Sequence, residues 1–216
     1  MCGSYDLLEV FKVHRRASSR ETAKRIKEVA LRLFLEKGYS DVSLEEVASL
    51  VGITKPAIYI YYRSKAELFK AAMEELFSDM TSMVESVVSG KGSVVERFER
   101  LADVLVARFS EMKRLYGGGV SEPFLRRKMV LRRWGRGSGE DSAFFHRLRE
   151  NFLKKVEALF EEGASSGIFK RGLKIRFLAR SFVSMCAVCA MEDCSKETDT
   201  NPVVEVFLEG ILSEGS

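Results

Sequence analysis

The chain has 216 residues, of which 46% are hydrophobic and 31% charged, and it contains only three prolines. This composition supplies enough apolar side chains for a real core and excludes a disordered or low-complexity chain. The most apolar run, residues 182–191, is far shorter than the ~20 residues that span a bilayer. Because no secretory signal follows Met1 either, we expect a cytoplasmic protein without membrane contact.

The formal net charge is +4, and its distribution along the chain is uneven. Residues 12–37 hold nine basic and three acidic side chains, whereas residues 191–216 hold one lysine and seven acidic side chains. A basic N-terminal segment and an acidic C-terminal segment suit a molecule that presents one end to a polyanion. A solvated lysine-rich helix would produce the same pattern, so charge alone leaves both interpretations open.

Helical periodicity begins with an apolar stripe over residues 26–34, which predicts a helix that ends near Gly38. A capping box at residues 43–46 predicts a helix of only two turns, and Gly52 ends it. Thr54 then predicts the start of a third short helix. Two further capping boxes, at residues 64–67 and 93–96, open long helices.

Beyond residue 116 the pattern is interrupted by glycines and then resumes. We expect helices within residues 124–134, 145–159 and 175–191, and a last one that begins after Asn201. There is no internal repeat. The sequence therefore predicts an all-α fold of about nine helices.

The three short helices between residues 22 and 62 have the spacing of a helix-turn-helix. On the last of them only Ile58 and Tyr62 share an inward position, so that Tyr59 and Tyr61 are left for the outer surface. A tyrosine hydroxyl reaches a phosphate, and its ring packs on a sugar or a thymine methyl. This pattern favours contact with DNA.

The same segment resembles the N-terminal DNA-binding domain of the TetR family of transcriptional regulators over about residues 20–80. The positions that carry the resemblance are Arg25, Ile26, Ala30, Phe34, Gly38, Tyr39, Ser43, Val47, Ala48, residues 52–55, Ile58, Tyr59, Tyr62 and residues 64–68. The resemblance implies an all-helical homodimer, usually a repressor that a small molecule releases from its operator. It does not identify the effector, because the rest of the chain matches only in the size and order of its helices.

Carried over by position, the resemblance implies DNA contacts in the second and third helices and at the start of the fourth. The residues concerned are Ser43, Thr54, Lys55, Pro56, Ala57, Tyr59, Tyr61 and Lys65. Three positions depart from the family: Pro56 stands where glycine is common, Ile60 where a polar or aromatic residue is common, and Tyr62 where phenylalanine is usual. Because Pro56 and Ala57 supply few hydrogen-bond donors, we expect base readout to depend on apolar contact and DNA shape.

These expectations divide the chain into three parts. Residues 1–19 form an N-terminal arm whose basic residues follow the DNA, or else a disordered tail. Residues 20–66 form the helix-turn-helix domain, and residues 67–216 form a helical domain for effector binding and dimerisation.

Aromatic and apolar residues of the middle helices are the candidate wall of an effector pocket, although aromatic residues at helical spacing are usually ordinary core. They are Phe98, Phe109, Met112, Tyr116, Trp134, Phe145 and Phe152. Such a pocket would take an apolar or aromatic molecule. The basic residues around Trp134 would instead suit an anionic effector such as an acyl-coenzyme A, or they keep an exposed helix soluble.

Two stripes near the end of the chain predict a four-helix dimer interface. They consist of Leu178, Phe182, Cys186 and Cys189 on one helix and Val203, Phe207 and Ile211 on the next. Cys186 and Cys189 form a C-x-x-C pattern, for which we favour close packing over redox sensing. No histidine lies near them in sequence, so we expect neither a metal nor a cofactor.

Two other classes of function fit the sequence less well. An enzyme lacks support, because there are two histidines, no glycine-rich phosphate loop and no evident carboxylate pair. A helical adaptor that binds only proteins would leave the outward tyrosines and lysines of the third helix unexplained. The sequence thus predicts a DNA-binding regulator that is not an enzyme, most simply a homodimeric repressor of a palindromic operator.

Overall fold

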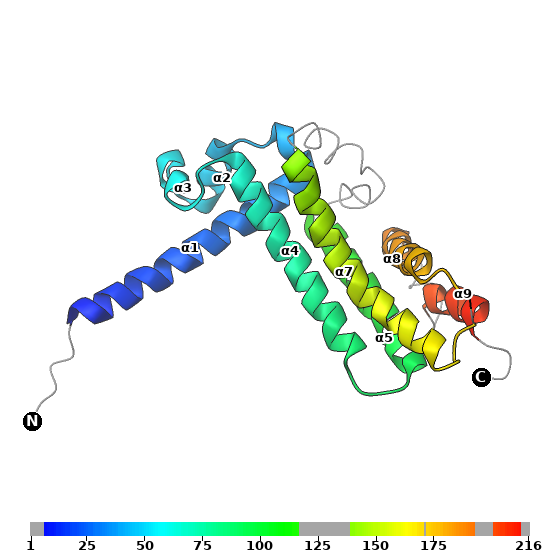
Figure 1. The fold of residues 1–216 in the computed structure, drawn as a ribbon. Coiled ribbons are helices and arrows are strands. Elements are labelled where there is room, and N and C mark those ends of the chain that lie inside the picture. The colour runs from blue at the N-terminus through cyan, green and yellow to red at the C-terminus, as the bar shows by residue number, and fades with distance from the viewer. Residues whose placement is uncertain (1–6, 117–138, 171, 193–200, 213–216) are drawn as a thin grey trace, which may run out of the picture. The chain divides into compact units, whose positions relative to one another are not determined.

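The computed structural model describes residues 7–116, 139–170, 172–192 and 201–212. Within these residues the chain forms eight α-helices and one 3-10 helix, and no strand (Figure 1). The elements are α1 (Leu7–Lys37), η1 (Tyr39–Asp41), α2 (Leu44–Val51), α3 (Lys55–Tyr61), α4 (Lys65–Val88), α5 (Val94–Tyr116), α7 (Gly139–Ser165), α8 (Ile175–Met191) and α9 (Pro202–Ile211). The all-α prediction is confirmed. The short helix expected within residues 124–134 lies outside the described residues.

The chain folds as two compact units, residues 1–73 and 74–216. The division lies inside α4, whose first turns pack in the first unit, whereas the sequence placed the boundary after residue 66. α1 begins at Leu7 and continues to Lys37. Residues 7–19, expected as an arm, are therefore helical backbone that continues into the first unit.

The first unit is built on the inward faces of α1, α2 and α3. Ile26, Phe34, Val47 and Ile58 are fully buried, at the positions that the apolar periodicity selects. The ring of Phe34 contacts that of Phe69 edge-on, with 4.9 Å between centroids. This contact fixes the first turns of α4 against the end of α1.

The second unit is organised around five mutually packed phenylalanines. Phe98, Phe160, Phe169, Phe182 and Phe207 come from α5, α7, the segment before α8, α8 and α9. The centroid of the Phe98 ring lies 4.7 Å from that of Phe182 and 5.4 Å from that of Phe160. Such edge-to-face and tilted aromatic pairs add to the free energy gained by burying the rings. One cluster thus joins every helix that follows α4 in the described part of the chain.

This cluster corrects the expectation for the predicted interface stripes. Six of the seven residues lie inside the chain's own core, and these are Phe182, Cys186, Cys189, Val203, Phe207 and Ile211; Leu178 is half-buried. The stripes are apolar because they pack against α5 and α7 of the same chain. They are not free to form a surface between two copies.

The segment between α7 and α8 is fixed to the last helix by its backbone. The Lys170 N–H donates to the Ile211 carbonyl at 2.8 Å, and the Phe169 N–H donates to the Gly163 carbonyl at 2.9 Å. Phe169 is fully buried and lies directly against Gly163, because an added Cβ at position 163 would come within 2.3 Å of its ring. Gly163 is therefore required for close approach of the ring.

A largely buried arginine joins three helices of the second unit. Arg97 of α5 donates to the Val88 carbonyl at the end of α4 at 2.6 Å. It also makes a two-point contact with Glu162 of α7, in which Nη1 lies 3.0 Å from Oε2 and Nη2 contacts Oε1. The arginine satisfies a helix-terminal carbonyl that has no partner within its own helix.

Candidate nucleic-acid interface

The turn between α2 and α3 has a defined geometry at both ends of α2. The Ser43 hydroxyl accepts a hydrogen bond from the Glu46 N–H at 3.1 Å, as the capping box predicts. At the other end Gly52 adopts φ 80° and ψ 32°, a left-handed conformation, and its N–H donates to the Ala48 carbonyl at 3.0 Å. The Ile53 N–H reaches the same carbonyl at 3.0 Å. The predicted helix-turn-helix is present.

α3 is fixed to the unit by the two residues that the sequence placed inward. Ile58 is fully buried, and Tyr62, just after the helix, is buried and donates its hydroxyl to the Ala23 carbonyl of α1 at 3.2 Å. Thr54 occupies the N-cap position of α3, but its side chain makes no capping hydrogen bond. Its hydroxyl is thus not used to start the helix.

The other predicted DNA contacts of this region lie at the surface to different degrees. Thr54, Pro56 and Tyr59 are exposed, as is Ser43 at the start of α2. Lys55, Ala57 and Tyr61 are half-buried. One side of α3 is thus accessible and could lie in the major groove of DNA, while the other side packs in the core.

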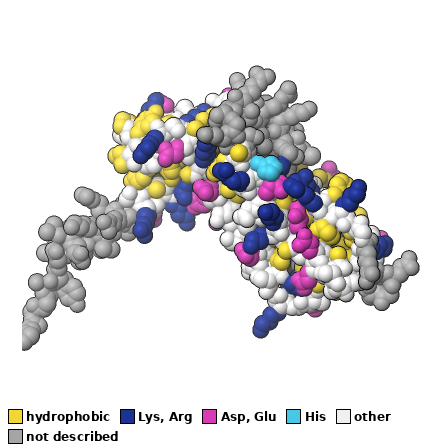
Figure 2. Space-filling model, in the orientation of Figure 1, with side chains coloured by type: hydrophobic (Ala, Val, Ile, Leu, Met, Phe, Trp, Pro, Cys, Tyr) yellow, Lys and Arg dark blue, Asp and Glu magenta, His cyan; other side chains and the backbone are white. Residues whose placement is uncertain are grey.

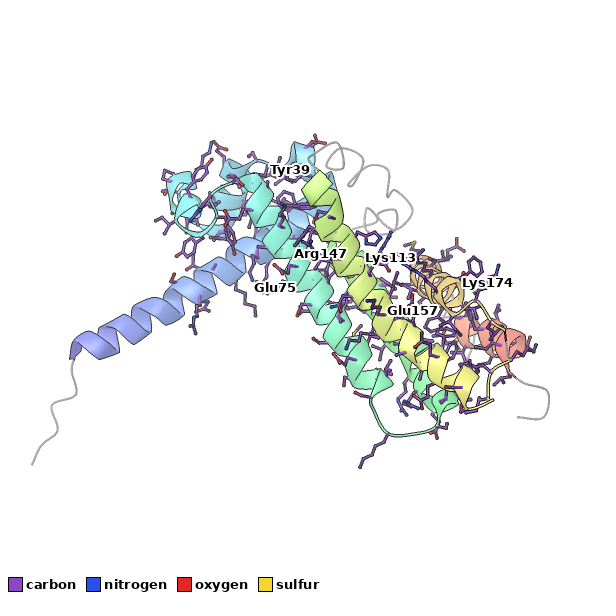
Figure 3. The ribbon with its side chains drawn as sticks, viewed as in Figure 1. Tyr39, Glu75, Lys113, Arg147, Glu157 and Lys174 are labelled. Atoms are coloured by element: carbon purple, nitrogen blue, oxygen red, sulfur yellow. The ribbon has the colours of Figure 1, made fainter. Side chains whose placement is uncertain are left out.

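Two of the predicted contacts are lysines that already bind within the chain. Lys55 pairs with Glu45 of α2, and this carboxylate raises the pKa of the lysine. Lys65 donates to the Ser40 carbonyl at 3.1 Å, and its Nζ lies 4.6 Å from the centre of the Tyr39 ring. Figure 3 shows Tyr39 next to the first turns of α4. These two contacts join α4 to η1. Partial burial lowers the pKa of Lys65, and its phosphate contact remains a prediction.

Two exposed apolar residues were not among the predicted contacts. Ile60 of α3 is 81% exposed, and Leu50 of α2 is 49% exposed. The sequence signal that could have found Ile60 is its spacing, since it lies two residues from the inward Ile58 and so on another side of the helix. An exposed isoleucine is unusual, since isoleucine is normally buried.

The predicted effector residues are mostly core. Phe98, Phe109, Met112 and Phe152 are buried, and Phe145 is half-buried. Phe98 and Phe152 are almost completely enclosed, and the ring of Phe98 contacts four other phenylalanines. The side chain of Tyr116 and all of Trp134, with the basic residues around it, lie outside the described residues. The effector pocket remains a prediction.

A group of cations on α7 and α8 shares a single carboxylate. Glu150 accepts a hydrogen bond from Arg180 at 2.9 Å and another from Arg176, and the nitrogens of His146 and Arg149 lie 3.9 Å from it. Desolvation opposes ionisation of Glu150, but Arg176 and Arg180 lower its pKa overall. The group carries more positive than negative charge. Several Lys and Arg side chains lie on the face of the second unit that Figure 2 shows.

The C-x-x-C cysteines lie in the packed interior. Cys186 and Cys189 are free thiols and both are buried. Burial raises the pKa of Cys186 far above its usual range, so the reactive thiolate is disfavoured. Within the described residues no three potential ligands gather as a metal site, and Cys194 lies outside them. No helix in this part of the chain combines the length and hydrophobicity that crossing a bilayer requires.

Comparison with known proteins agrees with this geometry. Residues 26–72 match the family model described as "Bacterial regulatory proteins, tetR family". The matched segment contains all of α2 and α3 and the buried residues that orient them. This part of the chain is a DNA-binding domain of the TetR family.

Relatives and solved structures of TetR-family regulators extend over different parts of the chain. The transcriptional regulator AcrR of Shigella flexneri is 43% identical over 56 residues, which cover 26% of this chain and 26% of that relative. The match thus spans about a quarter of that relative's length. It indicates a common DNA-binding domain and does not extend to the rest of the chain.

Two solved structures share the fold across most of this chain. FadR from Bacillus subtilis, in complex with stearoyl-CoA, has a TM-score of 0.65 at 20% identity and covers 87% of this chain and 98% of its own. AibR, in complex with isovaleryl coenzyme A and operator DNA, has a TM-score of 0.63 at 20% identity, with coverage of 88% and 98%. At this identity the comparison shows the fold alone.

Proposed function

We propose that the chain is a homodimeric transcriptional regulator of the cytoplasm that binds operator DNA through α3 and acts as a repressor. One observation carries the proposal. Within a helix-turn-helix held by Ile58 and Tyr62, α3 presents Tyr59 and its neighbours to solvent instead of to the core. An exposed aromatic face on the second helix of such a unit is suited to the major groove and its phosphate rims.

The dimer that this function requires is supported by the outer faces of α8 and α9. Phe177 and Val188 on α8 are 67% and 40% exposed, and Val206 on α9 is 58% exposed. Gly210, one turn beyond Val206, is open to close approach, since an added Cβ would meet nothing within 4 Å. Apolar residues on two neighbouring helices suit a two-fold, four-helix contact. This face replaces the buried stripes as the proposed interface.

Selection from a random DNA pool tests DNA binding and symmetry together. Two recognition helices should select an inverted repeat whose half-sites lie about 34–36 Å apart or a multiple of that distance. The variant Tyr59→Ala should bind the selected site more weakly by about 1–3 kcal/mol, because it loses a groove contact. The matched control is Leu115→Ala, which shortens an exposed side chain of α5. Selected sites without a dyad would contradict the proposal.

We further propose that the effector binds in the second unit. α4 is continuous between the two units, so a ligand that favours one spacing of the two recognition helices would release the operator. A small apolar or aromatic molecule is one candidate. A second candidate, an acyl-coenzyme A, is favoured by the excess of cations around Glu150 and by the acyl-coenzyme A complexes named for FadR and AibR.

The two effector classes separate in a release assay. Operator-bound protein is titrated with stearoyl-coenzyme A, stearate and free coenzyme A, and the remaining complex is measured by fluorescence anisotropy. If the effector is an acyl-coenzyme A, we expect only stearoyl-coenzyme A to release the operator. The variant Arg176→Ala, which lacks one cation, should need more of it for the same release. Lys154→Ala is the charge-matched control on exposed α7 surface. Release by stearate with equal potency in both variants would favour the apolar class.

A further inference from the structure

The recognition helix is almost without the side chains that usually identify bases by hydrogen bonding. Residues 54–61 read Thr-Lys-Pro-Ala-Ile-Tyr-Ile-Tyr, with no Arg, Asn, Gln, Asp or Glu. Guanine is usually read by Arg or Lys, and adenine by Asn or Gln, through two hydrogen bonds. The single candidate is Lys55, and its ammonium group is paired with Glu45. The hydroxyls of α3 and Thr54 can bind many partners but do not discriminate between bases in this way.

What α3 does present is an apolar surface. Pro56, Tyr59 and Ile60 are all exposed, and their spacing of i, i+3 and i+4 places them on one side of the helix. Ile60 is the most exposed of the large apolar residues in the described part of the chain, and Leu50 of α2 is half-exposed. Figure 2 shows hydrophobic side chains gathered over this part of the first unit.

The floor of the major groove offers one chemical group that matches such a surface. Among the four bases only thymine carries an apolar substituent there, the C5 methyl group. An isoleucine that enters the groove gains free energy by covering this methyl group and loses free energy against the polar edge of a G·C pair.

We propose that Ile60 is a specificity-determining residue and that each operator half-site presents thymine methyl groups to the face formed by Pro56, Tyr59 and Ile60. This inference rests on the proposed function and adds the class of sequence that the protein reads. Specificity then arises mainly from methyl contacts, and the tyrosine hydroxyls and backbone contacts hold the helix in position.

The proposal is tested by replacing thymine with deoxyuridine at each position of the selected half-site. The replacement removes the methyl group and leaves every hydrogen-bonding group of the base unchanged. A covered methyl group corresponds to about 0.8 kcal/mol, so the parent should lose about fourfold in affinity at each contacted position. At the position whose methyl group Ile60 covers, Ile60→Ala should bind the thymine and deoxyuridine sites equally. The comparison of the two proteins on the two sites is a double-mutant cycle.

The control is Leu115→Ala, a truncation of another exposed apolar side chain in the second unit, which should keep the parent's preference for thymine. Circular dichroism verifies that Ile60→Ala is folded, as expected for an exposed position. The inference is overturned if the parent binds a selected operator but no deoxyuridine substitution weakens it, or if folded Ile60→Ala keeps the parent's discrimination. If the parent selects no DNA site at all, the proposed function itself fails, and the apolar face is then a surface for a protein partner.

Discussion

At position 163 the absence of a side chain determines whether Phe169 can be buried. The ring of Phe169 lies against the α7 backbone and packs between Phe98 and Phe160, with centroid distances of 6.1 Å to each. Because the ring is enclosed on its other sides, it cannot move away from a new methyl group without disturbing the cluster. Burial of Phe169 thus requires a hydrogen atom in place of a side chain at position 163.

Gly163→Ala should lower the free energy of unfolding by about 1–3 kcal/mol, the usual range for an overpacked core. Urea denaturation followed by circular dichroism measures this change. Ser165→Ala, at an exposed position of the same helix, should stay within about 0.5 kcal/mol of the parent. Equal stability of the two variants would mean that Phe169 does not lie against α7 as described.

Residues whose role depends on neighbours in sequence were predictable, and residues whose role depends on distant partners were not. Ser43 and Gly52 were identified because a capping box and a helix-ending glycine are written within a few positions. Phe182 was assigned to a surface because α8 carries apolar residues on both sides, and periodicity does not tell which side faces its own chain. Likewise, nothing near Lys65 in sequence predicts its contact with Tyr39.

At the scale of elements, one arginine and its ion pair connect three helices of the second unit. Arg97 links the end of α4 to α7 through Val88 and Glu162, and its own side chain is largely buried. The guanidinium group lowers the pKa of Glu162, chiefly through the hydrogen bond between them. A carboxylate whose pKa is lower in the folded chain stabilises the fold above its unfolded pKa, about 4.3, and loses that effect as the pH falls through the folded value.

Glu162→Gln should therefore be less stable than the parent at neutral pH, by about 1 kcal/mol, since Glu162 is itself half-exposed and its pairing is screened by solvent. The difference should shrink as the pH is lowered below about 4.3. Thermal unfolding at a series of pH values measures it. As a control, Glu157→Gln changes the same charge on α7 at a residue outside the Arg97–Glu162 pair. A difference that is constant from neutral to acidic pH would contradict the pairing.

At the scale of the whole molecule, α8 has two apolar sides, one buried in the core of the chain and one exposed. The side with Phe182 packs inside the chain, and the side with Phe177 and Val188 faces outward. The positions are only a few residues apart, so substitutions of the same chemical kind should have different consequences. That difference distinguishes a core from an interface between copies.

Phe177→Glu should give a folded chain that sediments as a monomer, because a charge placed in a paired apolar contact costs about 2 kcal/mol or more. It should also bind the operator weakly, since one protomer reaches one half-site. Phe182→Glu should instead unfold the second unit. Leu115→Glu, at a comparably exposed position of α5, should remain dimeric. A dimeric Phe177→Glu that binds operator like the parent would place the interface elsewhere.

The phenylalanine cluster also sets an order of events during synthesis. The first unit is complete once residue 73 has been made, but the cluster closes only when Phe207 can join Phe98. Because chains grow at about 5–20 residues per second and domains fold as units, the helix-turn-helix precedes a finished second unit by on the order of ten seconds. Until Phe207 is made, Phe98, Phe160 and Phe182 each lack one aromatic partner. The nascent chain therefore passes through a stage in which exposed aromatic surface, and not any defect of the first unit, is its principal aggregation hazard.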